Sequence, residues 1–419
     1  MKVGITGVTG FVGSGIACDF LKNGHQVLAV SRNDKDGLRS KAAIRKAWIG
    51  YGYDISELNE DRVEVVSVDF AKPEQIGDSL AKTLDVFWHV AAEMSYSSKS
   101  FMKSFQQNIT NTAALHRYLA EMAPKLKRFY YVSTAYTGGF ANKGIIKEEI
   151  HVAPEVDNVY QALKWAAELT LERQSQDYDL PVSLFRPSIV VGHSETGYRA
   201  GSNFGIYGFI KASYLAAKYN YKTLRFNLNE NAEANLIPVN YLSEWAVLLS
   251  ERDDQTREFE IYNANSVSVV KISEMADLVK GLLDIEILIE KPQTDIDRRI
   301  NKMTQRNAPF AKKSWYFESN NLRNTLKEKH REFVMSEKSL RVIVERYLSE
   351  LDLEFESDNK RYSLKETLRR ASGSLSNVGS KIKAKRSSGV MTKVEANQTK
   401  HIVKKKISSL LGIKKKHRA

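Results

Sequence analysis

The sequence predicts an α/β fold. We expect a doubly wound parallel sheet of the Rossmann type, followed by a smaller C-terminal substrate-binding region and a disordered basic tail. Two observations support this prediction. Short apolar strands alternate with helical segments of about 12–20 residues, which is typical of βαβ units. The first strand leads directly into a glycine-rich turn and an apolar helical stripe, as in a phosphate-binding turn.

This turn carries the first group of candidate binding residues. Three glycines recur at every third position, directly after the first strand. Glycines let the backbone turn tightly and approach a pyrophosphate, while the helix N-terminus supplies free N–H groups and a positive dipole end. We therefore expect this segment to bind a dinucleotide. Its candidate residues are Gly7, Thr9, Gly10, Phe11, Val12 and Gly13.

Strands and helices are expected where apolar residues follow the corresponding period. In the first half of the chain, strands are expected over 3–6, 25–30, 62–68, 86–90 and 129–132, and helices over 38–51 and 101–122. Farther along, strands are expected over 237–240, 259–263 and 285–290, a helix is expected over 243–249, and the segment 325–353 is expected to be mainly helical.

Three regions follow from this order. Residues 1–196 are expected to form the nucleotide-binding domain, to which later segments return. Residues 197–356 form the substrate-binding and C-terminal helical region. Residues 357–419 form the basic, largely disordered tail, with an amphipathic helix over 400–413.

The residues after the second strand bear on the choice of cofactor. An acidic side chain there would hold the adenosine ribose 2′-OH and favour NAD, whereas an arginine can pair with a 2′-phosphate and favour NADP. Arg32 stands at this position, and the first acidic residue is Asp34. We expect Arg32 to select NADP (NADPH), with Arg45 as a second contact. The alternative is that Arg32 is a solvated loop residue.

The ends of the third and fourth strands complete the expected cofactor site. Asp69 and Phe70 end the third strand, where such a pair lies under the adenine in this fold. Ala91 and Ala92 follow the fourth strand and are small enough for close backbone approach to the cofactor. His89 is expected to be a core histidine bonded to the backbone.

The chemistry is expected at Tyr160 and Lys164, which lie on one helix face about one turn apart. An ammonium group beside a tyrosine stabilises the phenolate and lowers the pKa of the phenol. A hydroxyl at the end of the fifth strand, from Thr134 or as a fallback from Ser133, would bind a substrate carbonyl oxygen. We expect hydride transfer to the carbonyl carbon, with Tyr160 protonating the oxygen.

These motifs resemble those of the extended short-chain dehydrogenase/reductases. The resemblance is carried by TGVTGFVG (6–13), VDF (68–70), HVAA (89–92), QNITNT (107–112), YVSTAY (131–136), YQALK (160–164) and RPSIVVG (186–192). It implies that Thr134, Tyr160 and Lys164 form a catalytic triad. It also implies that Asn108 supports a proton-relay water. The backbone of Pro187 and Ser188 would border the nicotinamide.

Three features resemble one branch, the thioester reductases and fatty-acyl-CoA (male-sterility-like) reductases. They are the basic helix after the second strand, the STAY ending of the fifth strand and RPSIVVGHSETG over 186–197; residues 308–323 are similar more loosely. The resemblance implies NADPH-dependent reduction of an acyl thioester to an aldehyde or alcohol. We expect coenzyme A or a separate carrier to present the thioester.

Other functions remain open from the sequence. The aromatic stretch 204–221 either lines a lipophilic channel or packs as core. A nucleotide-sugar epimerase or dehydratase and a steroid-like 3-hydroxy/keto dehydrogenase are alternative enzymes. A non-catalytic dinucleotide-binding regulator is the alternative of another class. No metal site is expected, because none of the eight histidines pairs with another at ligand spacing. The oligomeric state is left open.

The basic charge is concentrated in the tail. Residues 361–419 carry 17 Lys/Arg and 2 Asp/Glu, a net of +15, so the total of +13 leaves −2 for the rest. Together with a single cysteine and the lack of a signal peptide or membrane-spanning run, this predicts a cytoplasmic protein. The tail would contact an anionic membrane, with a solvated tail as the alternative. Nucleic-acid binding is not expected.

Overall fold

The computed structural model describes residues 1–357, with gaps at 96–97, 140–143 and 253–257. The chain divides into two units, Met1–Leu348 and Ser349–Ala419. The sheet and the cavity described below belong to the first unit. The predicted amphipathic helix over 400–413 and the rest of the tail beyond residue 357 lie outside the described residues.

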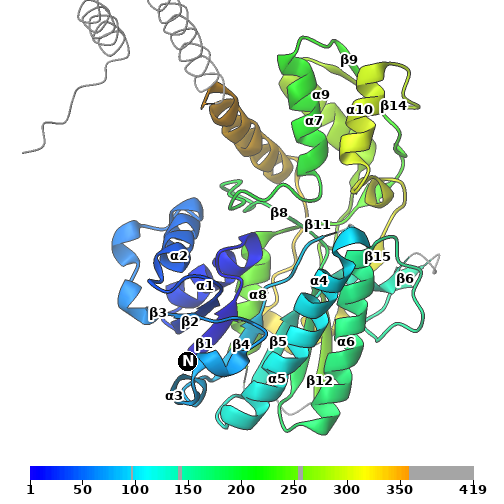
Figure 1. Ribbon diagram of the computed structural model, residues 1–419. Coiled ribbons are helices and arrows are strands. Elements are labelled where there is room, and N and C mark those ends of the chain that lie inside the picture. Colours follow the sequence, from blue (N-terminus) through cyan, green and yellow to red (C-terminus); the bar gives the residue numbers. More distant parts are fainter. Residues whose placement is uncertain (96–97, 140–143, 253–257, 358–419) are drawn as a thin grey trace, which may run out of the picture. The chain divides into compact units, whose positions relative to one another are not determined.

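A parallel sheet forms the centre of the first unit (Figure 1). Its strands are β1 (Lys2–Thr6), β2 (Gln26–Ser31), β3 (Val63–Ser67), β4 (Val86–His89), β5 (Arg128–Val132), β7 (Val182–Pro187) and β12 (Phe259–Ala264). Their order across the sheet is β12-β7-β5-β4-β1-β2-β3, and all neighbours are parallel. The order reverses between β1 and β4, where Thr6 pairs with His89. In sheets of this kind such a switch point leaves a crevice at the carboxyl ends of the strands.

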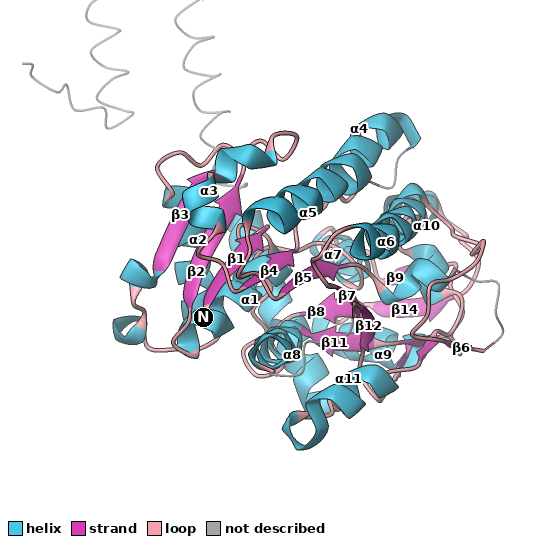
Figure 2. Cartoon of the chain, turned by 90° about the horizontal axis from the view of Figure 1, so that it is seen from below, coloured by secondary structure: helices cyan, strands magenta, loops and turns pink. Residues whose placement is uncertain are grey.

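Helices cover both faces of this sheet, as Figure 2 shows. One face carries α1 (Phe11–Lys22), α2 (Leu38–Gly50), α8 (Val239–Glu251) and α11 (Asn320–Leu326). The other carries α3 (Asp78–Ala81), α5 (Asn111–Met122) and α6 (Val159–Asp177). Each face buries its own apolar cluster, and Cys18 of α1 is fully buried in the first. The predicted doubly wound parallel sheet is confirmed.

The helix expected over 101–122 contains a change of pitch. It begins as α4 (Phe101–Phe105), passes through a π-helical turn (Gln106–Thr110) and continues as α5. π-Turns of this kind insert into α-helices and are frequent near functional sites.

A smaller region lies above the sheet in Figure 1. It contains α7 (Tyr207–Lys218), α9 (Ile272–Leu283), α10 (Asp295–Thr304), β9 (Thr223–Phe226) and β14 (Glu286–Ile289). β9 and β14 pair in parallel, and α7 packs against both α9 and α10. Three further pairs of short strands are β8 (Ile189–Val191) with β11 (Leu236–Pro238), β10 (Glu233–Ala234) with β13 (Val270–Lys271), and β6 (Ile145–Ile146) with β15 (Tyr316–Phe317).

The segment 325–353 is mainly helical, as predicted, but the helix is interrupted. α11 ends at Leu326, and after a short 3₁₀ turn residues 330–336 are not helical; the next helix starts at residue 337. In this interval the carbonyl oxygen of Phe333 accepts from the backbone N–H of Val267 and from the Ser266 hydroxyl. The backbone N–H of Met335 donates to Ser268 Oγ at 2.7 Å. These long-range hydrogen bonds replace the helical ones.

Candidate active site

A cavity of about 810 Å³ opens at the carboxyl ends of the central strands. Its walls come from the turn after β1, from the segments that follow β2, β4, β5 and β7, and from the smaller region. The predicted residues that line it are Gly7, Thr9, Gly10, Phe11, Val12, Gly13, Arg32, Phe70, Ala91, Ala92, Ser133, Thr134, Tyr160, Lys164, Pro187 and Ser188. Most of the predicted site residues are thus brought together.

The turn after β1 requires glycine at two positions. Gly7 has a φ of +77°, and a Cβ atom there would lie 2.9 Å from the backbone nitrogen of Ala91. A Cβ atom at Gly13 would lie 2.2 Å from the carbonyl oxygen of Gly7, so α1 could not approach the turn as closely. The turn and the start of α1 therefore pack closely, and Gly7, Gly10 and Gly13 all line the cavity. This geometry fits a pyrophosphate.

A buried hydroxyl that the sequence analysis missed holds the end of β4. Thr6 Oγ1 accepts from the backbone N–H groups of Val90 and Ala91, each at 3.0 Å, and lies 2.9 Å from His89 Nδ1. His89 Nε2 lies 3.0 Å from Thr112 Oγ1. Burial lowers the pKa of His89 to about 3, so the ring is neutral. His89 is a core histidine as predicted, but its partners are hydroxyls and not backbone groups.

Two arginines border the cavity beyond β2. Arg32 Nη1 donates to Gln107 Oε1 at 2.6 Å, and its guanidinium lies 5.8 Å from the ring centre of Phe70. Arg39, at the start of α2, also lines the cavity and donates to the Arg32 and Asn33 carbonyl oxygens. The sequence analysis missed Arg39, although its place in the first helical turn after the β2 loop is a usable signal.

The first acidic side chain after β2 accepts hydrogen bonds from the backbone at the start of α2. Asp34 accepts from the backbone N–H groups of Arg39 (3.0 Å) and Ser40 (2.9 Å) and from the Ser40 hydroxyl (2.6 Å). Burial alone would raise the pKa of Asp34, but the hydrogen bonds from Ser40 and Arg39 outweigh it and lower the pKa. Asp34 is therefore an ionised carboxylate committed to the start of α2 and does not line the cavity.

Three predicted residues do not line the cavity. Arg45 is exposed and its Nε donates to Glu60 Oε1 at 2.9 Å. Asp69 is exposed, and its carboxylate accepts from the Ala71 N–H at 3.1 Å. Asn108 is buried in the π-helical turn, where its amide exchanges hydrogen bonds of 2.7 and 3.0 Å with the backbone of Glu93. Since Glu93 itself lines the cavity, Asn108 reaches the site through the loop after β4.

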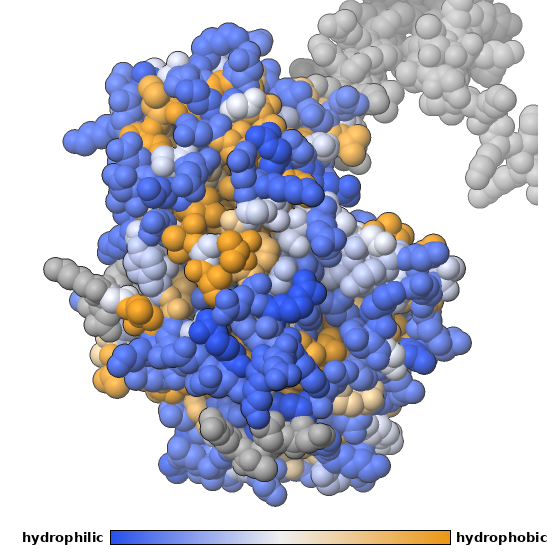
Figure 3. Space-filling model, turned by 180° about the vertical axis from the view of Figure 1, so that it is seen from behind, coloured by the Kyte–Doolittle hydropathy of each residue, from blue (hydrophilic) through white to orange (hydrophobic). Residues whose placement is uncertain are grey.

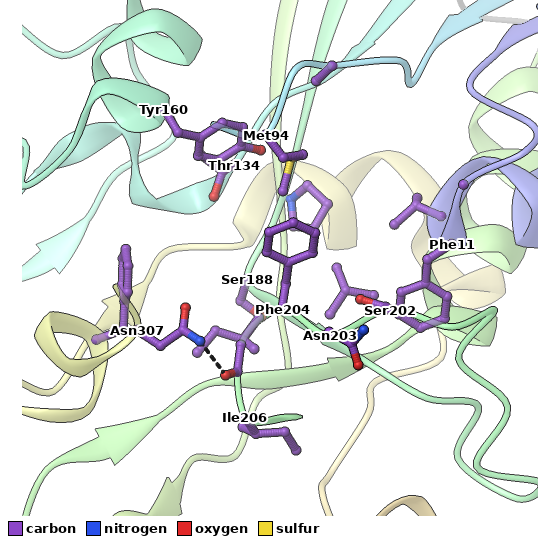
Figure 4. A pocket seen from close by; sticks show the side chains of 18 of the residues that line it. Phe11, Met94, Thr134, Tyr160, Ser188, Ser202, Asn203, Phe204, Ile206 and Asn307 are labelled. Carbon is purple, nitrogen blue, oxygen red and sulfur yellow. Dashed lines mark hydrogen bonds between the residues drawn. The ribbon is translucent and has the colours of Figure 1, made fainter. Parts of the chain in front are cut away.

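Thr134 and Tyr160 face the same space from two elements, the end of β5 and the start of α6 (Figure 4). Thr134 caps the 3₁₀ turn that follows β5, and its carbonyl oxygen accepts from the Thr137 hydroxyl at 3.2 Å. Met94 and Phe204 lie across from the two hydroxyls in Figure 4. A group that enters between them meets two hydroxyls on one side and apolar side chains on the other.

Lys164 lies deeper than Tyr160 and is buried. Its Nζ donates to the carbonyl oxygen of Val132 at 2.6 Å and lies 4.3 Å from the ring centre of Tyr131. Burial lowers the pKa of Lys164 to about 7, and the negative charge of Glu168 opposes this effect. The amine therefore gains and loses its proton near neutral pH.

Two buried hydroxyls of the cavity wall, those of Ser133 and Ser188, have no hydrogen-bond partner within the described part of the chain. Buried polar groups of native proteins are nearly always paired, by protein or by ligand. Both serines follow the ends of central strands and stand beside Thr134 and Pro187. These orphaned hydroxyls and the glycine turn fit a nicotinamide dinucleotide.

The other half of the cavity is apolar. Among its described residues beyond position 197 none is charged. Apolar walls come from Phe204, Ile206, Phe209, Ile210, Phe226, Leu228, Ile272, Met275, Ala276, Val279, Ile287, Ile289, Phe310 and Ala311. Asn307 Nδ2 donates to the carbonyl oxygen of Gly205 at 3.1 Å and holds the loop that carries Phe204 (Figure 4). Apolar residues also gather at the middle of the molecular face in Figure 3.

Two further searches covered only the described residues. No group of three or more His, Cys, Asp and Glu side chains there could hold a metal ion. In the same part of the chain, the helices are too short or too polar to cross a membrane.

This fold and cavity define an NAD(P)-dependent oxidoreductase of the extended short-chain dehydrogenase/reductase type. The chain belongs to the male sterility protein family, whose model matches residues 5–246. The resemblance to that branch is thereby confirmed, and a nicotinamide dinucleotide is its cofactor.

Similar proteins are much longer than the matched part. The non-canonical nonribosomal peptide synthetase cpsA of Aspergillus campestris is 26% identical over 273 residues, which cover 60% of this chain and 24% of that protein. The isonitrile lipopeptide synthase of Mycobacterium tuberculosis is 26% identical over 276 residues, 59% of this chain and 11% of that protein. The chain thus spans a quarter or less of these relatives.

Solved structures share the fold. The terminal R domain of the myxalamid PKS-NRPS pathway superimposes with a TM-score of 0.67 at 20% identity, covering 84% of this chain and 90% of that one. The UDP-glucuronic acid 4-epimerase of Bacillus cereus, in complex with NAD, gives 0.61 at 17% identity, covering 84% and 99%. Both likenesses concern the fold alone.

Proposed function

We propose that this protein reduces an acyl thioester with NADPH as the hydride donor. The proposal rests on one observation: a single cavity contains both the predicted catalytic residues and an apolar part. The glycine turn and the Thr134, Tyr160 and Lys164 side chains line one part of it. The other part, which we call the apolar chamber, is formed by residues beyond position 197, and none of those described is charged. Relatives that act in nonribosomal peptide and lipopeptide synthesis support a carrier-bound or coenzyme A-bound acyl substrate.

The preference for NADPH rests on charge at the end of β2. A 2′-phosphate near Arg32 and Arg39 meets two guanidinium groups, and these form strong charge-assisted hydrogen bonds with phosphate oxygens. An NAD-type site would need a free carboxylate there, whereas the Asp34 carboxylate is occupied by the backbone of α2. When bound, the nicotinamide dinucleotide supplies the hydride.

Residues of this chain orient the substrate carbonyl and transfer the proton to it. The Thr134 and Tyr160 hydroxyls donate hydrogen bonds to the thioester oxygen and polarise the carbonyl carbon. As that carbon receives the hydride, Tyr160 transfers its proton to the oxygen. The ammonium of Lys164 stabilises the resulting phenolate, which regains a proton from solvent.

The reaction balances with one hydride and one proton. The hydride forms a new C–H bond and Tyr160 completes an O–H bond, which gives a hemithioacetal. Its collapse breaks the C–S bond, and the hydroxyl proton passes to the leaving sulfur. The products are an aldehyde and a thiol, and a second hydride and proton would give the alcohol.

The apolar chamber favours a lipophilic acyl group over a nucleotide sugar. A nucleotide sugar carries a diphosphate, whose charge requires cationic partners or helix N-termini. The described chamber walls beyond position 197 supply no cation. The same walls would gain about 0.8 kcal/mol for every methylene that they remove from water.

The decisive experiment is a substrate panel. NADPH consumption is followed with acyl-CoAs, carrier-bound acyl groups, aldehydes and nucleotide sugars, each with wild type and Tyr160→Phe. We expect turnover of acyl thioesters and a decrease of about 10²–10⁴-fold in kcat for the variant. Inactivity toward every thioester would remove the proposed substrate, and an equally active variant would remove the proposed proton donor.

We also propose that the basic tail brings the protein to anionic membranes, where lipophilic substrates reside. The support is the net charge of +15 over 361–419. The full chain should sediment with phosphatidylserine vesicles at low salt, and the chain without residues 372–419 should stay in the supernatant. Equal sedimentation of the two would contradict this role.

A further inference from the structure

A fully buried ion pair lies behind the proposed catalytic residues. Glu168 of α6 and Arg186 of β7 both have an exposed fraction of 0%. Arg186 Nε and Nη2 donate to the two carboxylate oxygens of Glu168 at 2.9 and 2.7 Å, and Nη1 donates to the Glu149 carbonyl oxygen. A bidentate ion pair of this kind fixes both side chains in place.

This pair connects three of the elements that build the site, namely α6, the turn after β5 and the end of β7. Glu168 lies one helical turn after Lys164 on α6. The Thr137 hydroxyl lies 3.5 Å from Glu168 Oε1 and 3.2 Å from the Thr134 carbonyl oxygen, so it connects the pair to the turn that carries Thr134. Arg186 directly precedes Pro187 and Ser188 in the cavity wall.

From these contacts we propose that Glu168, held in place by Arg186, is a positioning residue that keeps the Lys164 amine protonated when the site turns over. The inference rests on the proposed function and adds a residue that does not line the cavity. Glu168 acts through Lys164 and the Thr134 turn and not on the substrate.

The charges around Lys164 support this role. The groups that face it are Tyr160 and Glu168 of its own helix, His89 of β4 and Tyr131 of β5. His89 is neutral, and burial keeps Tyr131 protonated by raising its pKa. Among these described neighbours, Glu168 supplies the negative charge that opposes the loss of the Lys164 proton.

The direction in which the pH midpoint of proton loss shifts when Glu168 loses its charge can be predicted. The negative charge of Glu168 delays the loss of the Lys164 proton, and in the proposed mechanism the same charge acts on the Tyr160 phenol one turn away. Glu168→Gln removes the negative charge and leaves Arg186 positive. The midpoint of the first proton loss should therefore fall by about one pH unit or more. Glu168→Gln/Arg186→Met removes both charges, so its midpoint should fall by less.

Two measurements test the proposal. One is the pH dependence of kcat/KM for thioester reduction. The other needs no turnover: the phenolate absorbance of each protein is titrated against the same protein carrying Tyr160→Phe. Glu172→Gln, which removes a partly exposed carboxylate one turn farther along α6, is the matched control and should keep the wild-type midpoint.

The outcomes separate positioning from simple structural support. Midpoints in the order Glu168→Gln, double variant, wild type would support the proposal. Unchanged midpoints with a uniform loss of activity would overturn it. If Glu168→Gln does not fold, the double variant decides, because it buries no unpaired charge. If wild type reduces no thioester, the absorbance titration still tests Glu168 while the proposed function fails.

Discussion

At the residue scale, the acidic residue after β2, Asp34, binds the backbone at the start of α2. Its carboxylate accepts three hydrogen bonds from Arg39 and Ser40 and so anchors the first turn of α2. That anchor presents Arg39 at the cavity beside Arg32. Asp34 thus fixes the backbone at the start of α2, and Arg39 lines the cavity.

Arg32→Ala and Arg39→Ala should each raise KM for NADPH by about 10- to 100-fold, because each removes a charge-assisted contact to the 2′-phosphate. KM for NADH should change little. Initial-rate kinetics with both cofactors provide the measurement. Arg45→Ala is the matched control, since Arg45 pairs with Glu60 outside the cavity. Equal losses with NADPH and NADH would contradict 2′-phosphate recognition.

Single residues also show which contacts the sequence could not predict. The glycine turn, Thr134, Tyr160 and Lys164 were found because their spacing within one segment carries the signal. The sequence does not show that Arg45 pairs with Glu60, in the 3₁₀ turn Glu60–Arg62, and so lies outside the cavity. Thr6 was missed because its hydroxyl serves β4, which lies more than 80 residues away. Long-range pairings of this kind leave no local pattern.

At the element scale, the contact between α1 and α8 contains a buried acid. Asp19 of α1 accepts from the Tyr53 hydroxyl at 2.9 Å and from the Ser243 hydroxyl of α8. Burial raises the pKa of Asp19 from 3.8 to about 6, although the hydrogen bonds from Ser243 and Tyr53 oppose the rise. The native protein therefore holds this proton more tightly than the unfolded chain does.

The sign of the resulting pH dependence follows from this difference. The stabilisation by the proton is complete below about pH 4 and is lost as pH rises through about 6. A difference of roughly two units corresponds to about 3 kcal/mol in the free energy of unfolding. Asp19→Asn should flatten this part of the stability profile. Urea unfolding between pH 4 and 8 provides the measurement, and an unchanged slope in the variant would contradict the assignment.

The start of α1 gives a second prediction at this scale. Gly13→Ala places a Cβ atom 2.2 Å from the Gly7 carbonyl oxygen, so the helix must move away from the turn. Cofactor affinity, measured by NADPH fluorescence, should fall at least tenfold. Gly281→Ala in α9, where a Cβ atom meets nothing within 4 Å, is the matched control. It should keep the affinity and stabilise the protein by about 0.5–1 kcal/mol.

Elements were predictable where local pattern and tertiary packing agree. β1, β2 and α1 follow their apolar periods, since both faces of the central strands are buried. The segment 330–336 has helix-compatible residues, but Phe333 and Met335 bond to the loop after β12. A tertiary partner therefore overrides the local preference there.

At the scale of the whole molecule, the cavity is assembled from distant parts of one unit. Its described lining runs from Gly7 to Ala311, and all of these residues belong to the first unit. Deleting residues 372–419 should leave NADPH affinity, the melting temperature and activity on a water-soluble thioester within about twofold or 1–2 °C of the full chain. Calorimetry and kinetics on both proteins test this. A large loss in any of the three would show that the tail supports the fold.

The reactivity of Cys18, the single cysteine of the sequence, can report how often α1 detaches from the protein. Cys18 lies on the same helix as the glycine turn, is fully buried, and burial raises the pKa of its thiol. A thiol reagent can modify it only when this helix detaches, so the labelling rate measures how often the nucleotide-binding half opens. A ligand that binds only the closed protein slows labelling by 1 + [L]/Kd. At about 100 times Kd, NADPH should slow it about 100-fold, which gives its affinity relative to NADH without any turnover.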